Sequence, residues 1–397
     1  ARLKERREIT RSGGGKSNGG AARADWRYTL SFAVGLCAGE IARIDRVWAN
    51  GQPFDLAAVA HRVHRGDEIQ GVDPLIEAIE GAGAAPAYRG LAYIVFEDMP
   101  LDGFGDVLPQ MSFEVVRGPI DDAPRLETMA RGVCLIPGSG EFACATTPVR
   151  RVIAAGRETT ENAHADPERA NIDVSLDQLA QDMPGVETVS LVSAWFGDDL
   201  RCGDCTIRPG VEIAAKETRP LIWQAGGVTR AGAHVVSVIE DAPAFGGTPC
   251  DDSIVEALAS LKARGLRVGL NPFVLMDIPP GNALGQPAFP WRGRISCDPS
   301  VADKSAAVTS QVAAFFGAAT AGDFSVSSGV IACTAPDWGY RRFILHHAHL
   351  AALAGGVDFF LIGSELPGLT KLRDEVGAFP AVDALRALAA DVRAVLG

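Results

Sequence analysis

Carboxylate side chains follow several short apolar segments in the second half of the chain. Asp199, Asp277 and Glu365 each come shortly after a segment that has the pattern of a buried strand. In α/β barrels, the carboxyl ends of the strands carry the catalytic groups. Two carboxylates there can cleave a glycosidic bond, one acting as acid and the other as nucleophile or base. We therefore predict Glu365 as a general acid, with Asp277 and Asp199 as the alternatives for the second carboxylate within this sequence.

Aromatic and basic residues accompany these carboxylates. Trp195 and Asp198 end the first of the apolar segments, and Trp291 and Arg292 lie in the long segment after Asp277. Carboxylates accept hydrogen bonds from sugar hydroxyls, while an indole face stacks on the apolar side of a sugar ring. We expect these four residues to bind a carbohydrate substrate.

Structural roles compete with this interpretation. Helix or turn capping is the better explanation for each of four acidic residues taken alone: Asp198, Asp199, Glu240 and Asp241. Glu365 can also be kept for a salt bridge with Arg341, Arg342 or Arg373. The sequence therefore leaves open whether this part of the chain is an enzyme.

Composition and spacing argue against a nucleic-acid-binding, a membrane-spanning or a metal-binding protein. The 397 residues carry 37 Lys and Arg against 49 Asp and Glu, a net charge of −12, which disfavours a broad nucleic-acid surface. The sequence has no uninterrupted run of 18 apolar residues, so no membrane-spanning helix is predicted. Cys202-Gly-Asp-Cys205 lacks a second pair at zinc-finger spacing and is interpreted as a loop. His346, His347 and His349 lie in an amphipathic run and are expected to be helix residues, so we predict neither metal nor cofactor.

The chain changes its pattern near residue 160. Before it, short alternating runs at 28–34, 44–48, 92–96 and 111–116 predict strands, and Asn50-Gly51 predicts a hairpin turn. After it, helices alternate with short apolar segments, as in parallel βα units. We expect a flexible basic and glycine-rich arm over 1–20, a β-rich region over 21–160 and an α/β domain over 161–397.

A barrel explains the second region better than a nucleotide-binding sheet. Four strands are expected, at 186–195, 234–239, 266–276 and 357–362, with long segments after strands and short ones before them. No G-x-G-x-x-G opens the first helix. Because a closed barrel has eight strands, we predict about the first half of a TIM-barrel-like domain. The nucleophile is then expected on a later strand beyond Gly397.

Several strings resemble the large tail-tip protein of gene transfer agents and related siphophage-like particles. The resemblance runs from about residue 16 to the end of the sequence, and the strings that carry it are residues 28–46, 87–116, 196–212, 273–281, 289–297 and 361–370. The two loop strings, FGDDLRCGDCTIRPGVE and FPWRGRISC, are highly specific. Residues 105–110 depart from the family pattern, in which Asn and a basic residue are expected after the glycine, and this puts one polar contact of a hub loop in doubt.

The resemblance implies a β-rich tail-hub region followed by a glycoside-hydrolase-like barrel. The implied function is a structural component of the tail tip or baseplate hub of a DNA-delivery particle, with a barrel that binds or cleaves cell-envelope glycans. Its partners are other tail proteins and copies of itself around the tail axis. The particle is assembled in the bacterial cytoplasm and acts at the recipient envelope, with DNA passing through the hub. The alternative is a free-standing carbohydrate hydrolase with a β-rich accessory module.

Overall fold

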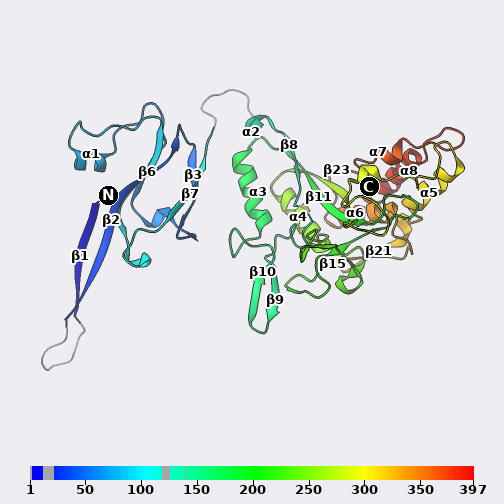
Figure 1. Cartoon of the computed structure of the whole chain (residues 1–397), viewed down its shortest axis with the longest axis horizontal. Coiled ribbons are helices and arrows are strands. Elements are labelled where there is room, and N and C mark those ends of the chain that lie inside the picture. Colours follow the sequence, from blue (N-terminus) through cyan, green and yellow to red (C-terminus); the bar gives the residue numbers. More distant parts are fainter. Residues whose placement is uncertain (1, 12–21, 119–125, 138) are drawn as a thin grey trace. The chain divides into compact units, whose positions relative to one another are not determined.

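A computed structural model describes residues 2–11, 22–118, 126–137 and 139–397 (Figure 1). The chain forms two compact units, unit 1 over residues 1–125 and unit 2 over residues 126–397. No helix in the described ranges combines the length and the apolar character needed to cross a bilayer.

Unit 1 consists mainly of strands, as predicted. Two antiparallel sheets have the orders β1-β2-β6-β5 and β4-β3-β7. The strands are β1 (Arg2–Arg11), β2 (Ala22–Ala38), β3 (Arg43–Ala49), β4 (Gln52–Pro53), β5 (His61–His64), β6 (Leu91–Pro100) and β7 (Met111–Val116), joined by α1 (Pro74–Glu80) and the 3-10 turns Leu56–Ala58 and Asp102–Phe104. All four strand segments predicted before residue 116 are confirmed.

Side-chain alternation and turn chemistry explain this arrangement. Phe32 of β2 stacks on Phe96 of β6 at 4.8 Å between ring centroids, within the buried core of the unit. Asn50 and Gly51 have φ of 52° and 77° and join β3 to β4. A two-residue turn with both φ values positive matches the twist of a hairpin, so the predicted turn is confirmed.

The predicted arm is corrected for residues 2–11. They form β1, which pairs with β2 from Arg2 opposite Ser31 to Arg11 opposite Ala22. Backbone hydrogen bonds form this ladder, and the charged sequence of β1 has no apolar alternation that reveals it. Residues 12–20 of the predicted arm lie outside the described residues.

Unit 2 is built on four parallel strands. β8 (Gly132–Leu135), β11 (Thr188–Gly197), β20 (Arg267–Met276) and β23 (Phe359–Phe360) lie side by side in chain order. β12 (Ile207–Arg208) joins β11 antiparallel at its carboxyl end. A helix stands between each strand and the next, which is the arrangement of consecutive βα units.

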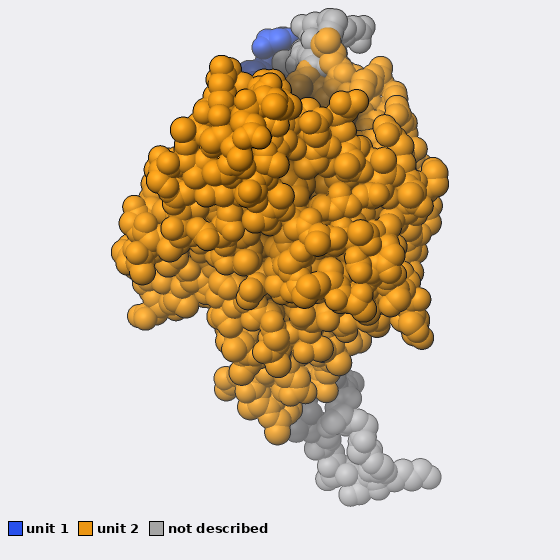
Figure 2. All heavy atoms as spheres, turned by 90° about the vertical axis from the view of Figure 1, so that its right-hand side faces the viewer, with its two compact units in different colours: residues 1–125 blue, residues 126–397 orange. Residues whose placement is uncertain are grey.

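Helices cover one face of this sheet. They are α3 (Asn171–Asp182), α4 (Asp251–Ala263) and α6 (Tyr340–Leu353). Leu191 of β11 and Leu270 of β20 pack against Leu258 and Leu350 of these helices, and all four are fully buried. Gly265 ends α4 with φ of 77°, as predicted. Figure 2 shows one face of unit 2 as a closely packed surface.

The other elements of unit 2 are short, apart from two further helices. The helices are α2 (Leu126–Met129), α5 (Ala306–Phe316), α7 (Pro367–Thr370) and α8 (Pro380–Leu396), with 3-10 turns η3 (Arg230–Gly232), η4 (Arg292–Arg294) and η5 (Ala321–Asp323). The strands are β9 (Arg150–Ala154), β10 (Arg157–Thr160), β13 (Gly210–Val211), β14 (Glu217–Arg219), β15 (Gln224–Ala225), β16 (Val228–Thr229), β17 (His234–Val235), β18 (Val238–Ile239), β19 (Ala242–Pro243), β21 (Phe324–Ser327) and β22 (Val330–Cys333).

Two predictions about the strand-to-domain assignment are corrected. The boundary expected near residue 160 falls at 125/126, because β8 pairs with the start of β11 and so belongs to unit 2. The segment 234–239 contributes no strand to the parallel sheet. It is divided between β17, which pairs with β13, and β18, which pairs with β19. β8 takes the place of this segment as a parallel strand, and its four residues are too few to show a pattern.

A buried carboxylate organises one end of unit 1. Asp73 is fully buried and caps α1 by accepting hydrogen bonds from the Leu75 and Ile76 amides. It also accepts from Arg62 Nε at 2.8 Å and lies 2.9 Å from His64 Nε2. Burial alone would raise the pKa of Asp73, but these partners outweigh it and lower the pKa to about 2.

We predict that unit 1 loses stability in acid through Asp73. Because the folded pKa lies below the unfolded value, this contribution is present above about pH 4 and is lost as the pH falls toward about 2. It amounts to about 2 kcal/mol. Hydrogen exchange of the β6 amides as a function of pH measures it. Asp73→Asn should flatten the acid dependence, whereas Asp106→Asn, at an exposed loop position, should leave it intact; equal profiles for the two variants would contradict the assignment.

Candidate functional site

Glu365 lies just after β23, in the segment that leads into α7. Its backbone has φ of 55°, a left-handed conformation that few non-glycine residues adopt. The side chain is half exposed, and its Oε2 accepts a hydrogen bond from Trp291 Nε1 at 2.6 Å. Arg292 Nη2 lies 2.7 Å from the same oxygen. We call Glu365, Trp291 and Arg292 the Glu365 cluster.

Arg292 anchors this cluster to the sheet. Its guanidinium is 5% exposed, lies 3.4 Å from the centroid of the Phe273 ring on β20, and donates from Nε to the Ser364 carbonyl. Burial lowers the pKa of Arg292, while the charge of Glu365 opposes this shift. The sheet therefore fixes the arginine, and the arginine fixes Glu365.

Trp291 presents the accessible part of the cluster. It is 51% exposed. A β-carbon on Gly293 would come within 2.4 Å of the indole ring, so only glycine leaves room for the ring there. An exposed indole beside a half-exposed carboxylate offers both an apolar face and a hydrogen-bond acceptor, which are the two features that sugar rings need.

Asp277, directly after β20, is buried. Its Oδ2 lies 2.6 Å from His234 Nε2 and accepts from the Ser237 amide at 3.0 Å. Its Oδ1 is buried without a hydrogen-bond partner among the described residues. Burial alone would raise the pKa of Asp277, but the hydrogen bonds from His234 and Ser237 keep it below its ordinary value. No hydrogen bond or ion pair joins Asp277 to Glu365 in the described part of the chain.

Asp199 and Asp198 hold the loop after β11. Asp199 is buried and accepts from Arg201 Nη2 at 2.6 Å and from Gln286 Nε2 at 2.7 Å. Burial opposes ionisation, yet these donors lower the pKa of Asp199. Asp198 accepts from the amide and hydroxyl of Thr206. Both aspartates therefore have the turn-stabilising role that was the alternative to catalysis.

Trp195 does not reach the candidate site. It is 1% exposed and packs against Phe343, His346 and His347 of α6, with ring centroids 5.4–5.6 Å away. Its odd position in β11 points it to the helix-covered face, since side chains alternate along a strand. The prediction that Trp195 binds substrate is therefore corrected.

The salt bridge that was the alternative role for Glu365 exists, but with another arginine. Arg341 pairs with Asp391, Arg373 pairs with Asp303, and Arg342 donates to backbone carbonyls. Glu365 instead pairs with Arg292, which sequence reasoning had assigned to substrate. Phe273 was missed altogether, because an inward-facing strand residue carries no distinguishing sequence signal.

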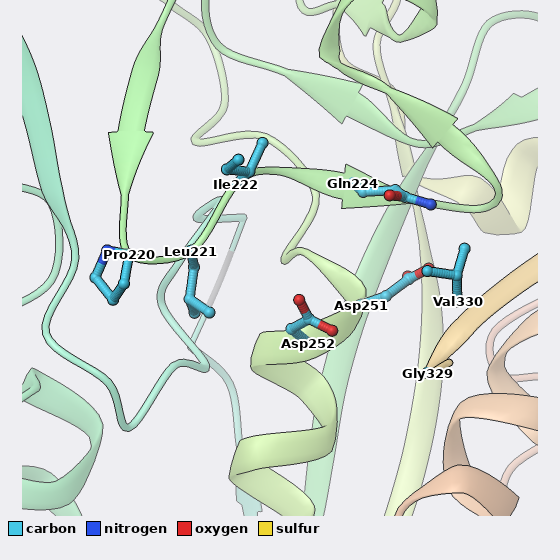
Figure 3. A pocket seen from close by; sticks show the side chains of 8 residues that line it. All are labelled: Pro220, Leu221, Ile222, Gln224, Asp251, Asp252, Gly329 and Val330. Atoms are coloured by element: carbon cyan, nitrogen blue, oxygen red, sulfur yellow. The ribbon is translucent and has the colours of Figure 1, made fainter. Parts of the chain in front are cut away.

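A pocket of about 270 Å³ opens at the amino end of α4, and no residue of the Glu365 cluster lines it (Figure 3). Asp251, Asp252 and Gln224 supply its polar lining, and its apolar walls include Ile222 and Val330. Asp251 Oδ1 lies 2.9 Å from His346 Nε2, so this carboxylate also fixes α6. None of the predicted site residues lines this pocket.

The helix histidines are packing residues, as predicted. His346 and His347 are buried, and His347 Nε2 lies 3.1 Å from the Ser193 hydroxyl. Burial lowers the pKa of His347 to about 3, so it is neutral at ordinary pH. His349 stacks on Phe324 at 5.0 Å.

Three carboxylates gather around a buried lysine. Among the described residues, Glu141, Glu161 and Glu212 form the one group with the spacing of a metal site. Lys216 Nζ lies 2.7–3.0 Å from all three and is 1% exposed. Arg230 also pairs with Glu141, at 2.6 Å. The ammonium occupies the position that a cation would take, so the geometry indicates an ion-pair network that holds loops together.

Comparison with known proteins connects the chain to gene transfer agents (GTAs). Residues 338–397 match the family model described as the GTA TIM-barrel-like domain. This range contains α6, β23, Glu365, α7 and α8. The resemblance to gene transfer agents is thereby confirmed, and unit 2 is TIM-barrel-like, as predicted. No curated protein matches the chain.

Solved structures give further similarities. A chain in the virion of a native GTA particle is 50% identical over 28% of this chain and 27% of that chain, with a TM-score of 0.24. Two GH113 beta-1,4-mannanase structures, one of them a complex, are 19% and 18% identical over 56% and 57% of this chain, with TM-scores of 0.27. The matches span 46% and 47% of the mannanase chains, so the chain corresponds to less than half of each of these proteins. TM-scores this low do not establish a shared overall fold.

We predict that Lys216→Met destabilises unit 2 by about 3–5 kcal/mol, because it leaves three carboxylates facing one another without the ammonium. Thermal or denaturant unfolding measures the loss. Lys371→Met is the matched control, since Lys371 is exposed. Equal stability of the two variants would refute the role given to Lys216.

Proposed function

We propose that the chain is a structural component of the tail tip or baseplate hub of a gene transfer agent particle. The observation that carries the proposal is the match of residues 338–397 to the GTA TIM-barrel-like domain. The 50% identity to a chain of a native GTA virion agrees with it. Unit 1, with its two antiparallel sheets, is the hub portion in this proposal, and unit 2 is the envelope-directed portion.

The proposed partners follow from this role. They are other tail and baseplate proteins and further copies of this chain around the tail axis. A net charge of −12 suits protein contacts better than a sequence-reading nucleic-acid surface. DNA passes through the assembled hub without a dedicated binding site on this chain.

We also propose that unit 2 supplies the first half of a barrel. β23 pairs on one side with β20, and among the described residues no strand pairs with its other edge. Ser190 and Asn271 have buried side-chain oxygens without partners among the described residues. Both alternate with Leu191 and Leu270 on the helix-covered face, so they point to the opposite side, the interior of a barrel. Further strands on that side would satisfy both features.

The Glu365 cluster is the proposed glycan site. Trp291 supplies the stacking face and Glu365 the acceptor or proton donor, while Arg292 holds the carboxylate in place. Peptidoglycan is the substrate class that suits a tail tip crossing a cell wall. Asp277 and Asp199 remain the alternatives for a second carboxylate in this chain, although each has a structural partner.

We predict that the chain co-sediments with capsid and tail proteins when released particles are separated on a density gradient. An antibody or mass spectrometry of the fractions provides the measurement. Recovery of the chain only from the soluble fraction would reject the hub role and favour the free-standing hydrolase.

We predict that Glu365→Gln reduces release of reducing ends from purified peptidoglycan by about 10²–10⁴. Glu375→Gln, at an exposed position after α7, should keep full activity. Undiminished release by Glu365→Gln would exclude Glu365 as the acid. If no form of the chain releases reducing ends, but the parent chain binds insoluble peptidoglycan and Trp291→Ala does not, the cluster binds glycan without cleaving it.

A further inference from the structure

The two long loops at the carboxyl ends of β11 and β20 run side by side. Arg201 and Ser296 form a parallel backbone bridge. The Cys202 amide donates to the Ser296 carbonyl at 2.7 Å, and the Ser296 amide donates to the Leu200 carbonyl at 2.9 Å. The residues that follow this bridge on the two loops, Cys202 and Cys297, are therefore neighbours.

The thiols of these residues face each other. Their Sγ atoms are 3.8 Å apart, which is van der Waals contact, although 95 residues separate them in the chain. Cys202 is fully buried, while Cys297 is partly exposed. Cys205, the nominal partner of Cys202 in the C-x-x-C string, is directed to the Thr206 carbonyl instead.

We infer that Cys202 and Cys297 form a disulfide that ties the loop after β11 to the loop after β20. The oxidant is a low-molecular-weight disulfide of the glutathione class. The Cys297 thiolate attacks it, forming a mixed disulfide and releasing one thiol. Cys202 then loses its proton and attacks the Cys297 sulfur, releasing the second thiol. Two electrons pass from the cysteine pair to the oxidant, and its two thiols take up the two protons.

One cysteine of the disulfide lies close in the chain to two residues of the Glu365 cluster. Cys297 lies on the same loop as Trp291 and Arg292. This loop is packed closely on the residues after Glu365, since Ser296 Oγ donates to the Gly368 carbonyl and a β-carbon on Gly368 would come within 2.3 Å of the Ile295 carbonyl oxygen. The disulfide fixes both loops around the Glu365 cluster.

The surroundings of the thiols set the conditions for the reaction. Burial raises the pKa of both thiols, and the neighbouring sulfur adds to this for Cys202. Few thiolates are present at neutral pH, so oxidation is slow in a reducing cytoplasm and proceeds on long exposure outside. The timing, formation after release of a particle, rests on the proposed function, whereas the pairing does not.

Oxidation of the purified full chain tests the pairing. The reduced protein is incubated with oxidised glutathione at about pH 8, alkylated and peptide-mapped. We expect a Cys202–Cys297 cross-linked peptide in the parent chain and in Cys205→Ser, and none in Cys297→Ser. Exposed Cys134, an internal control for accessibility, should take up glutathione without a partner in the chain. A Cys202–Cys205 link, or Cys297 left as a glutathione adduct, would overturn the inference.

Thermal unfolding gives a second measurement. Oxidation should raise the melting temperature of the unit 2 transition by about 5 °C or more in the parent chain, reversibly with dithiothreitol, and leave Cys297→Ser unchanged. An unchanged melting temperature in the cross-linked parent chain would exclude a stabilising role. Alkylation of released particles before lysis tests the timing. If both thiols are reduced in the particles while the purified chain forms the disulfide readily, the pairing stands and its formation in the particle is rejected.

Discussion

The parallel pairing of β11 with β20 is the constraint on which unit 2 depends. It runs in unbroken register from Thr188 opposite Arg267 to Gly197 opposite Met276. Because both strands end at the same level, the loops that follow them begin side by side. The amide of Asp277 donates to the Gly197 carbonyl and extends the ladder by one step. A slip of one residue would turn every side chain of β20 to the opposite face.

Polar and charged side chains secure the loops of unit 2. The Gln286 side chain bridges them, because its oxygen accepts from the Leu200 amide and its nitrogen donates to Asp199. Buried charges act in the same way. Removing Arg292 or Lys216 from water costs free energy, and each is retained because its partners are fixed by different segments of the chain. The buried ion pairs therefore hold separate loops together. Glu365 remains half exposed.

Local chemistry decided which elements could be predicted. The Asn50-Gly51 turn, and helix α4 with its stop at Gly265, were predictable because one or two residues set each conformation. β8 was missed because four residues show no periodicity. The segment 234–239 was misassigned since an apolar run does not reveal which strand it pairs with. Glu212 lies four residues before Lys216, but Glu141 and Glu161 reach the lysine only in the folded chain, so no spacing in the sequence points to the full set.

The contacts of Glu365 limit how it can take part in chemistry. Oε2 accepts the hydrogen bond from Trp291 and lies 2.7 Å from Arg292 Nη2, so both contacts of the carboxylate fall on one oxygen. In the proposed role of Glu365 as an acid, the proton is carried on Oε1, since no donor reaches this oxygen in the described part of the chain. The side chain of Glu365 is half exposed, and the buried arginine pairs with the other oxygen, Oε2. The left-handed backbone at Glu365 keeps the carboxyl group in this orientation and costs free energy that the Arg292 contacts offset. The same arrangement serves sugar binding, because an ionised Oε1 accepts a hydroxyl hydrogen where a protonated one donates.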